Sequence, residues 1–213
     1  MPERLVVGFD LDMTLVDSRP GIQATIDALA QESGERALAD PHLLDALLRR
    51  NLDLEFADRF PGGRAVELAD RFRDLYVTVG VPGTDALPGA ADALAAVRAA
   101  GAHTVVVTAK YEPNAHRCLH HVGLVVDEVF GWRYGPGKAE TLQECGAFAY
   151  VGDTPRDMEA ARVADALAVG VTTGPHDDAE LRAAGAHLVL SSLVEFPAWW
   201  AARPDRAHPG RGG

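Results

Sequence analysis

Short apolar runs alternate along most of the chain with segments whose apolar residues recur at helical spacing. The helical segments fall at about 88–100, 112–122, 138–145, 155–164 and 177–184. The apolar runs are typical of buried strands and fall at 5–9, 104–108, 128–130, 148–151, 167–171 and 187–190. Strands that alternate with helices in this way form a parallel sheet, so the pattern predicts an α/β fold.

A long helical segment interrupts this alternation. The first two predicted strands are more than ninety residues apart, which is too far for a simple crossover. Residues 17–84 contain no convincing strand but three helical patterns: GIQATIDALAQESG, DPHLLDALLRR and GRAVELADRFRDLYVTVG. We therefore predict a core formed by 1–16 and 85–202, an inserted helical domain at 17–84, and a disordered Pro/Gly-rich tail at 203–213.

Polar side chains follow several of the predicted strands. Asp10 and Asp12 are one residue apart and follow the first strand, so both carboxyl groups can face one small volume. Thr108 and Asp153 end later strands. The carboxyl ends of parallel strands meet at one edge of a sheet, so these residues are expected to lie close together. Two carboxylates this close need either a cation between them or one neutral carboxyl group.

Composition limits the partners of such a site. The chain has 213 residues, 47% of them hydrophobic, and a formal net charge of -11. This charge argues against binding to nucleic acid or to an anionic membrane, because both are polyanions. The chain has two lysines, Lys110 and Lys138, against eighteen arginines. A lysine retained in such an arginine-rich chain is a candidate for a compact positive charge in a functional site.

Cellular location and oxidation state follow from what the sequence lacks. The apolar runs are far shorter than a membrane span, and no secretory signal pattern is present. Cys118 and Cys145 stand apart from each other and outside any CxxC motif, which predicts reduced core residues and a cytoplasmic protein. His116 and His120 are four residues apart on a predicted helix, but no third ligand follows at a metal-binding spacing, which favours surface roles.

The order of the motifs carries more information than any one of them. The series runs Asp-x-Asp-x-Thr from Asp10, then a strand that ends in Thr108, then Lys138, then Gly-Asp-x-x-x-Asp from Gly152. With FDLDMTLVDSRPGI, VVVTAKYEPNAHRCLHHVGL and GVTTG, this series resembles the haloacid dehalogenase superfamily, and in particular its phosphoglycolate-phosphatase-like branch. The resemblance covers about 5–196. It implies a Rossmann-like core with a small helical cap inserted at 17–84, and a Mg²⁺-dependent phosphatase that acts on a small-molecule phosphate monoester.

The resemblance also implies a role for each motif residue. Asp10 is the expected nucleophile that forms an aspartyl-phosphate, and Asp12 the expected general acid and base. Thr108, Ala109 and Lys138 are expected to bind the phosphoryl group, with Thr14 orienting the loop. Carboxylate and carbonyl oxygens suit Mg²⁺. The expected direct ligands are the carboxylates of Asp10 and Asp153 and the backbone carbonyl of Asp12. Asp157 is expected to support these ligands from behind or to hold a water molecule that binds the metal.

The sequence departs from the family pattern at two motif positions. Met13 replaces a common glycine, although this position varies across the superfamily and its backbone need not have a positive φ. Ala139 replaces the proline that usually follows the motif lysine.

Several alternatives stay open. In the cap, Arg49 and Arg50 are candidates for binding a carboxylate or a second phosphate of the substrate. Arginines on a helix surface are more usually charged side chains in contact with solvent. The inserted segment could instead be a helical addition to the sheet that is unrelated to a cap. For the function, the alternatives are a sugar-phosphate mutase with the same core motifs and a catalytically inactive relative that only binds a ligand. Both a monomer and a homodimer are compatible with the sequence.

Overall fold

A single parallel sheet forms the centre of the molecule. The computed structural model describes residues 4–203, and within them six parallel strands follow the order β5-β4-β1-β6-β7-β8. The strands are β1 Val6–Phe9, β4 His103–Val107, β5 Glu128–Phe130, β6 Ala147–Gly152, β7 Leu167–Val171 and β8 Leu188–Leu190. Apolar residues from these strands are buried on both faces, as expected for a parallel sheet. The predicted α/β, Rossmann-like fold is confirmed.

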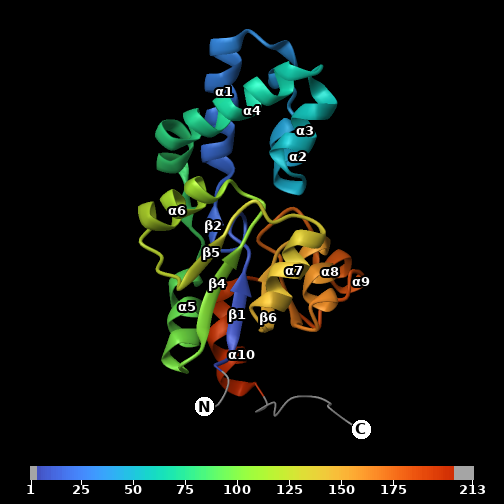
Figure 1. Cartoon of the computed structure of the whole chain (residues 1–213). Helices are drawn as coiled ribbons and strands as arrows, with labels where there is room; N and C mark the ends of the chain where they lie inside the picture. Colours follow the sequence, from blue (N-terminus) through green and yellow to red (C-terminus); the bar gives the residue numbers. More distant parts are fainter. Residues whose placement is uncertain (1–3, 204–213) are drawn as a thin grey trace.

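Helices cover both faces of the sheet (Figure 1). One face packs against α5 Ala90–Ala99, α6 Glu112–His121 and α10 Phe196–Ala202. The other face packs against α7 Pro136–Glu144, α8 Pro155–Val163 and α9 Asp178–Ala183. The sequence pattern predicted all of these helices except α10. Its Trp200 is buried against Phe196 and Phe148.

The inserted segment forms a separate helical layer beyond one end of the sheet (Figure 1). It contains α1 Arg19–Ser33, α2 Leu43–Arg49, α3 Leu52–Arg59 and α4 Gly63–Leu75. These helices share an apolar core of their own, which includes Leu29, Phe56 and Leu68. Cys118 of α6 packs into the same cluster, and both cysteines are free. The sequence patterns missed α3, and the domain boundaries at 17 and 84 stay predictions.

Two short strands connect the helical layer to the core. β2 Val16–Asp17 pairs in antiparallel fashion with β3 Asp85–Ala86, so the chain enters and leaves the helical layer at one place. Glycines allow this close approach: a Cβ atom built on Gly21 would lie 2.1 Å from the carbonyl oxygen of Gly80. We call this strand pair, with Gly21 and Gly80, the hinge.

Two further expectations concern location and the tail. Within residues 4–203, no helix is both long and apolar enough to cross a membrane. The tail predicted at 203–213 lies outside the described residues from 204 onward.

Candidate active site

The predicted site residues meet at the end of the sheet that faces the cap. β1 lies between β4 and β6, and Phe9 at its end is level with Val106 and Val151. The residues that follow these three strands include Asp10, Thr108 and Asp153, and all three are buried. Parallel strands with matched ends therefore bring together residues that are 45 or more positions apart in the sequence.

Lys138 supplies the positive charge at the centre of the site. It lies in the first turn of α7, buried, with Nζ 3.2 Å from Asp10 Oδ1 and 2.6 Å from Asp157 Oδ1. Burial lowers the pKa of Lys138, but the carboxylates of Asp10 and Asp157 more than offset this effect, so its pKa lies well above the usual value. Lys138 is therefore held in its charged form.

Burial dominates the electrostatics of the two carboxyl groups at the strand ends. It raises the pKa of Asp10 to about 7, although the ammonium group of Lys138 acts in the opposite direction. Burial likewise raises the pKa of Asp153 well above its usual value, and the charges of Asp157 and Asp10 add to the effect. Three carboxylates share one lysine here, so an additional cation would stabilise the ionised site.

Asp157 has little remaining capacity to bind a ligand directly. It is the third residue of α8 and closes a capping box, in which its Oδ2 accepts hydrogen bonds from the backbone N and the hydroxyl of Thr154. Its Oδ1 accepts from Lys138 at 2.6 Å and from the Tyr150 hydroxyl at 3.4 Å. Asp157 thus holds Lys138 and the start of α8 in place.

Asp12 is held by a residue that the sequence analysis did not assign. Lys110 Nζ donates to Asp12 Oδ1 at 2.9 Å, and Lys110 is almost fully buried. The same ammonium group lies 4.2 Å from the ring centroid of Tyr76, at the cap end of the hinge. Lys110 follows Thr108 by two residues and is the other of the chain's two lysines. The scarcity of lysine that singled out Lys138 could have identified it as well.

The loop after β1 has a strained conformation. Met13 adopts φ of 61°, so the expectation that its backbone needs no positive φ is wrong. Two contacts hold the turn: the Thr173 hydroxyl donates to the Met13 carbonyl at 2.6 Å, and the Thr14 hydroxyl donates to Asp153 Oδ1 at 3.1 Å. Left-handed backbone costs a residue other than glycine about 1 kcal/mol or more. Here the left-handed conformation of Met13 places Asp12 and Thr14 beside the carboxylate cluster.

The donor set at the strand ends fits Mg²⁺. Asp10, Asp153 and Asp157 each offer an oxygen within 4.8 Å of the others. Asp10 Oδ1 is buried and makes no hydrogen bond among residues 4–203, although Lys138 Nζ lies 3.2 Å away as an ion-pair partner. This oxygen therefore still has capacity to bind a ligand. Gly174 keeps the space beside Asp153 open, since a Cβ atom there would lie 1.8 Å from Asp153 Oδ2. Asp10 and Asp153 are the residues best placed to bind the ion directly.

A cleft between cap and core leads to the carboxylates. Thr108, Ala109, Lys138 and Asp153 line it from the core. Arg49 and Arg50 line it from the cap, and both already have partners. Arg49 donates to the Pro175 carbonyl at 3.1 Å and lies 3.2 Å from the His176 ring.

Arg50 is paired inside the cap, with Asp58 and with Glu55 at 3.6 Å. Assignment of Arg49 and Arg50 to an anionic group of the substrate stays a prediction.

The sequence analysis missed one further cation in the cleft. Arg156 is exposed and has no ion pair among residues 4–203. Its place inside the Gly-Asp-x-x-x-Asp motif could have revealed it.

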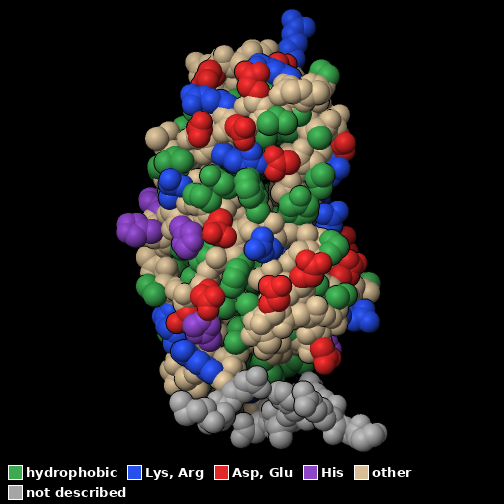
Figure 2. Space-filling model, viewed as in Figure 1, with side chains coloured by type: hydrophobic (Ala, Val, Ile, Leu, Met, Phe, Trp, Pro, Cys, Tyr) green, Lys and Arg blue, Asp and Glu red, His purple; other side chains and the backbone are tan. Residues whose placement is uncertain are grey.

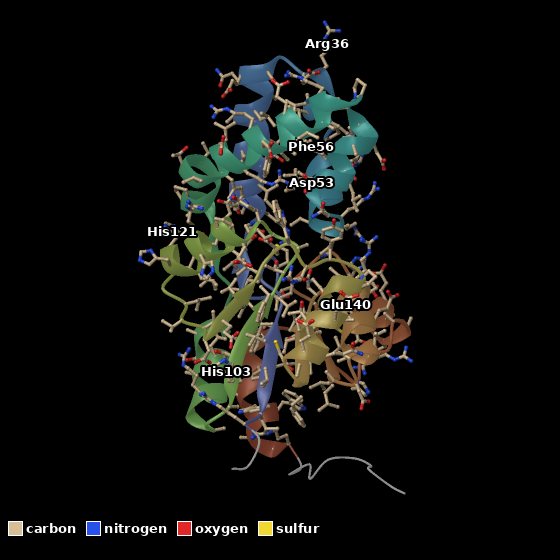
Figure 3. The ribbon with its side chains drawn as sticks, in the orientation of Figure 1. Arg36, Asp53, Phe56, His103, His121 and Glu140 are labelled. Atoms are coloured by element: carbon tan, nitrogen blue, oxygen red, sulfur yellow. The ribbon has the colours of Figure 1, made fainter. Side chains whose placement is uncertain are left out.

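The histidines of α6 stand apart from this site. His116, His120 and His121 are exposed on α6, and Figure 3 shows His121 pointing away from the molecule. Among residues 4–203, the three aspartates are the one group found with metal-binding spacing, and no histidine belongs to it. The preference for surface roles therefore agrees with the structure.

The raised pKa of Asp10 leads to a prediction for thermal stability. The unfolded chain ionises Asp10 near its ordinary pKa of 3.8, whereas the metal-free folded protein keeps the proton up to about 7. The metal-free protein should therefore lose stability as pH rises from about 4 to about 7. Mg²⁺ at ten times its Kd stabilises by about 1.4 kcal/mol, or about 3 to 6 °C in Tm.

We expect this shift in Tm to be larger at pH 8 than at pH 5, where protons compete with the ion. Thermal denaturation with and without Mg²⁺ at both pH values measures it, with Asp85→Asn, an exposed hinge residue, as the control. An equal shift at both pH values would contradict the link to the buried carboxylates.

Comparison with known proteins identifies the family. The model of the haloacid dehalogenase-like hydrolases matches residues 7–162, well over half of the chain. The chain is a haloacid dehalogenase-like hydrolase. A second model of related hydrolases matches residues 140–196. The predicted family and the prediction of a hydrolase are confirmed.

Individual relatives of this hydrolase agree with the family match. Phosphoglycolate phosphatase from Shigella boydii is 29% identical, over 79% of this chain and 81% of its own length. Among solved structures, a haloacid dehalogenase-like family protein from Streptococcus pneumoniae has a TM-score of 0.77 at 21% identity, covering 94% of this chain and 100% of its own. A putative beta-phosphoglucomutase from Thermotoga maritima has a TM-score of 0.65 at 18% identity, covering 91% and 97%. The two structures share the fold of this hydrolase.

Proposed function

We propose that this hydrolase is a Mg²⁺-dependent phosphatase that cleaves a small-molecule phosphate monoester through an aspartyl-phosphate at Asp10. The observation that carries the proposal is the buried cluster of Asp10, Asp153 and Lys138 at the strand ends, which has room for a cation and opens into the cleft. The phosphoglycolate phosphatase relatives support a phosphatase. The oligomeric state and the cytoplasmic location stay predictions.

In the first step, a carboxylate oxygen of Asp10 attacks phosphorus and the bond from phosphorus to the ester oxygen breaks. Asp12 donates its proton to the departing oxygen, so the leaving group departs as a neutral alcohol. The Thr108 hydroxyl, the Ala109 backbone and Lys138 bind the phosphoryl oxygens. Bound Mg²⁺ would offset the negative charge of the phosphoryl group and of Asp10.

In the second step, Asp12 acts as a base. It takes a proton from a water molecule as the water oxygen attacks phosphorus, and the bond between phosphorus and Asp10 breaks. Inorganic phosphate leaves and both aspartates return to their starting states. Lys110 is well placed to keep Asp12 oriented in both steps, through the 2.9 Å hydrogen bond.

A mutase is the second candidate, because the fold is shared with the beta-phosphoglucomutase neighbour. A mutase returns the phosphoryl group to a second hydroxyl of the sugar, whereas a phosphatase passes it to water. The third candidate is a catalytically inactive relative that only binds a ligand. The complete set of carboxylates and lysine favours an active enzyme over that reading.

Phosphate release with and without metal tests the proposal. We expect release from 4-nitrophenyl phosphate to stop with EDTA and to return with excess Mg²⁺. Ca²⁺ should bind but support little turnover, since its larger coordination shell misplaces the nucleophile. Release that persists in a metal-free preparation would contradict the metal assignment, and isomerisation of a sugar phosphate without release would favour the mutase.

The neighbouring arginines of the cap provide a matched pair of variants. Arg49 connects the cap to the core loop at Pro175 and His176, whereas Arg50 is paired inside the cap. We expect Arg49→Ala to lower kcat/KM by about 2- to 10-fold for anionic and neutral substrates alike, the effect of one or two lost hydrogen bonds. Arg50→Ala should have a smaller effect.

The measurement compares kcat/KM for 2-phosphoglycolate and benzyl phosphate in both variants. A loss confined to 2-phosphoglycolate would instead support the prediction that these arginines read a substrate carboxylate.

A further inference from the structure

The cleft continues past Asp12 into a second chamber between cap and core. This chamber contains about 600 Å³ of empty space, part of it open to solvent, and it shares Asp12 and Ala109 with the chamber that holds Asp10. Since Asp12 is the proposed proton donor to the leaving oxygen, the leaving group has to lie on the Asp12 side of the phosphoryl group. The second chamber, which extends from Asp12 away from Asp10, is therefore a space that can hold the leaving group.

The cations that line the second chamber all have carboxylate partners. Lys110 is bound to Asp12. Arg73 is bound to Asp53 and, at 2.8 Å, to Asp70. Figure 3 shows Asp53 on the cap helix α3 above the sheet. Arg50 is bound to Asp58 and Glu55.

A carboxylate or second phosphate on the leaving group would find no unpaired cation in this chamber, and it would lie beside Asp12 and Asp53. Arg49 and Arg156, which are exposed and have no carboxylate partner among residues 4–203, line the other chamber, on the side of the transferring phosphoryl group.

Aromatic side chains form much of the remaining lining. Tyr111 and Trp132 have ring centroids 5.1 Å apart, and Phe72 and Tyr76 stack at 5.9 Å. Hydrophobic side chains also gather on the surface across the middle of the molecule (Figure 2). Trp132 has 50% of its surface exposed and φ of 53°, a conformation that its backbone hydrogen bond to the Lys110 carbonyl holds. Backbone held in a sparsely populated conformation clusters at active sites and ligand-binding sites. The half-exposed ring of Trp132 offers a large apolar surface at the edge of this one.

We infer that the leaving group of the substrate is uncharged and carries an aromatic ring that packs against Trp132 and Tyr111. The inference rests on the proposed phosphatase function. It gives this chain a substrate class different from that in the name of its phosphoglycolate phosphatase relatives, because an anionic leaving group would find no unpaired cation in the chamber.

A panel of phosphate esters of alcohols tests the inference. Phenol esters are left out, because a phenolate departs more easily than an alkoxide whatever the contacts in the chamber. Benzyl phosphate is aromatic and neutral in its leaving group, and cyclohexylmethyl phosphate has similar size without a flat ring. 4-Carboxybenzyl phosphate adds a charge, and 2-phosphoglycolate is small and anionic. We expect kcat/KM for benzyl phosphate to exceed that for each of the other three by about 10-fold or more.

Variants at Trp132 test the contact itself. Trp132→Ala should lower kcat/KM for benzyl phosphate about 10-fold, and this loss should be at least five times the loss for 2-phosphoglycolate. Trp132→Phe keeps an aromatic ring and should retain most of the wild-type kcat/KM for benzyl phosphate. Val125→Ala, exposed and away from both chambers, is the control and should change neither value. If Trp132→Ala does not fold, Trp132→Phe and the wild-type panel still decide the question.

The outcomes separate the inference from the function on which it rests. Preference for 2-phosphoglycolate or 4-carboxybenzyl phosphate, or an equal loss for all substrates in a folded Trp132→Ala, would overturn the inference and leave the phosphatase intact. Acetyl phosphate serves as a small reactive reference. Failure to release phosphate from it and from all four esters in the presence of Mg²⁺ would overturn the proposed function itself.

Discussion

Asp10→Asn is expected to abolish phosphate release, with a loss in kcat of about 10⁴-fold or more, because the amide cannot form the aspartyl-phosphate. The variant should still fold. Asp10 is buried and its pKa is raised to about 7, so above that pH the metal-free folded state holds this charge at a cost in stability that asparagine removes. We therefore expect Tm at pH 8 to be no lower than that of the wild type.

Phosphate release and thermal denaturation of the same preparation provide the measurement. Asp85→Asn removes one negative charge from an exposed position in the hinge and should retain wild-type turnover. A folded Asp10→Asn protein with wild-type turnover would show that another group is the nucleophile.

The second large effect is expected for Asp12→Asn. General acid-base help is worth about 10² to 10⁴ in rate, and asparagine can neither donate nor accept the required proton. The loss in kcat/KM should depend on the leaving group: it should be larger for benzyl phosphate than for 4-nitrophenyl phosphate, because nitrophenolate departs with little help from an acid.

This dependence separates catalysis from structure. Asp12→Asn also breaks the ion pair with Lys110, which is buried beside Tyr76, so some loss of stability is expected. A loss caused only by misfolding or by a displaced Lys110 would be the same for both substrates. Lys110→Met is the matched variant, because it breaks the same pair while it leaves the carboxyl group in place.

The sheet and the core motifs could be predicted from the sequence because both depend on local patterns. Apolar runs located all six strands, and the residues that follow them identified Asp10, Thr108 and Asp153. Their convergence follows from a general property of parallel sheets, so no information about side-chain packing was needed. α10 was missed because its packing depends on Phe148, almost fifty residues before Phe196.

Contacts between distant segments could not be predicted in the same way. The ion pair of Lys110 with Asp12 joins residues 98 positions apart, and it depends on how the loops after β1 and β4 meet. Met13 keeps a positive φ because Thr173, 160 positions away, binds its carbonyl. A local pattern gives no sign of either partner.

The cap shows the same limit most clearly. Its three strongest helical patterns could be recognised, but α3 reads LDLEFADR, in which apolar and charged residues alternate at first instead of recurring at helical spacing. Whether Arg49 and Arg50 are free to bind a substrate depends on their partners, Pro175, His176 and Asp58, which only the three-dimensional structure identifies.

The most direct test of the aspartyl-phosphate is to trap it. The enzyme is mixed with excess acetyl phosphate and Mg²⁺, quenched in acid within one turnover and reduced with borohydride, which converts an acyl phosphate of aspartate to homoserine. Peptide mass spectrometry then locates the change. We expect homoserine at residue 10 in the wild type and none in Asp10→Asn. Rapid turnover without homoserine at residue 10, or with homoserine at another aspartate, would contradict the account.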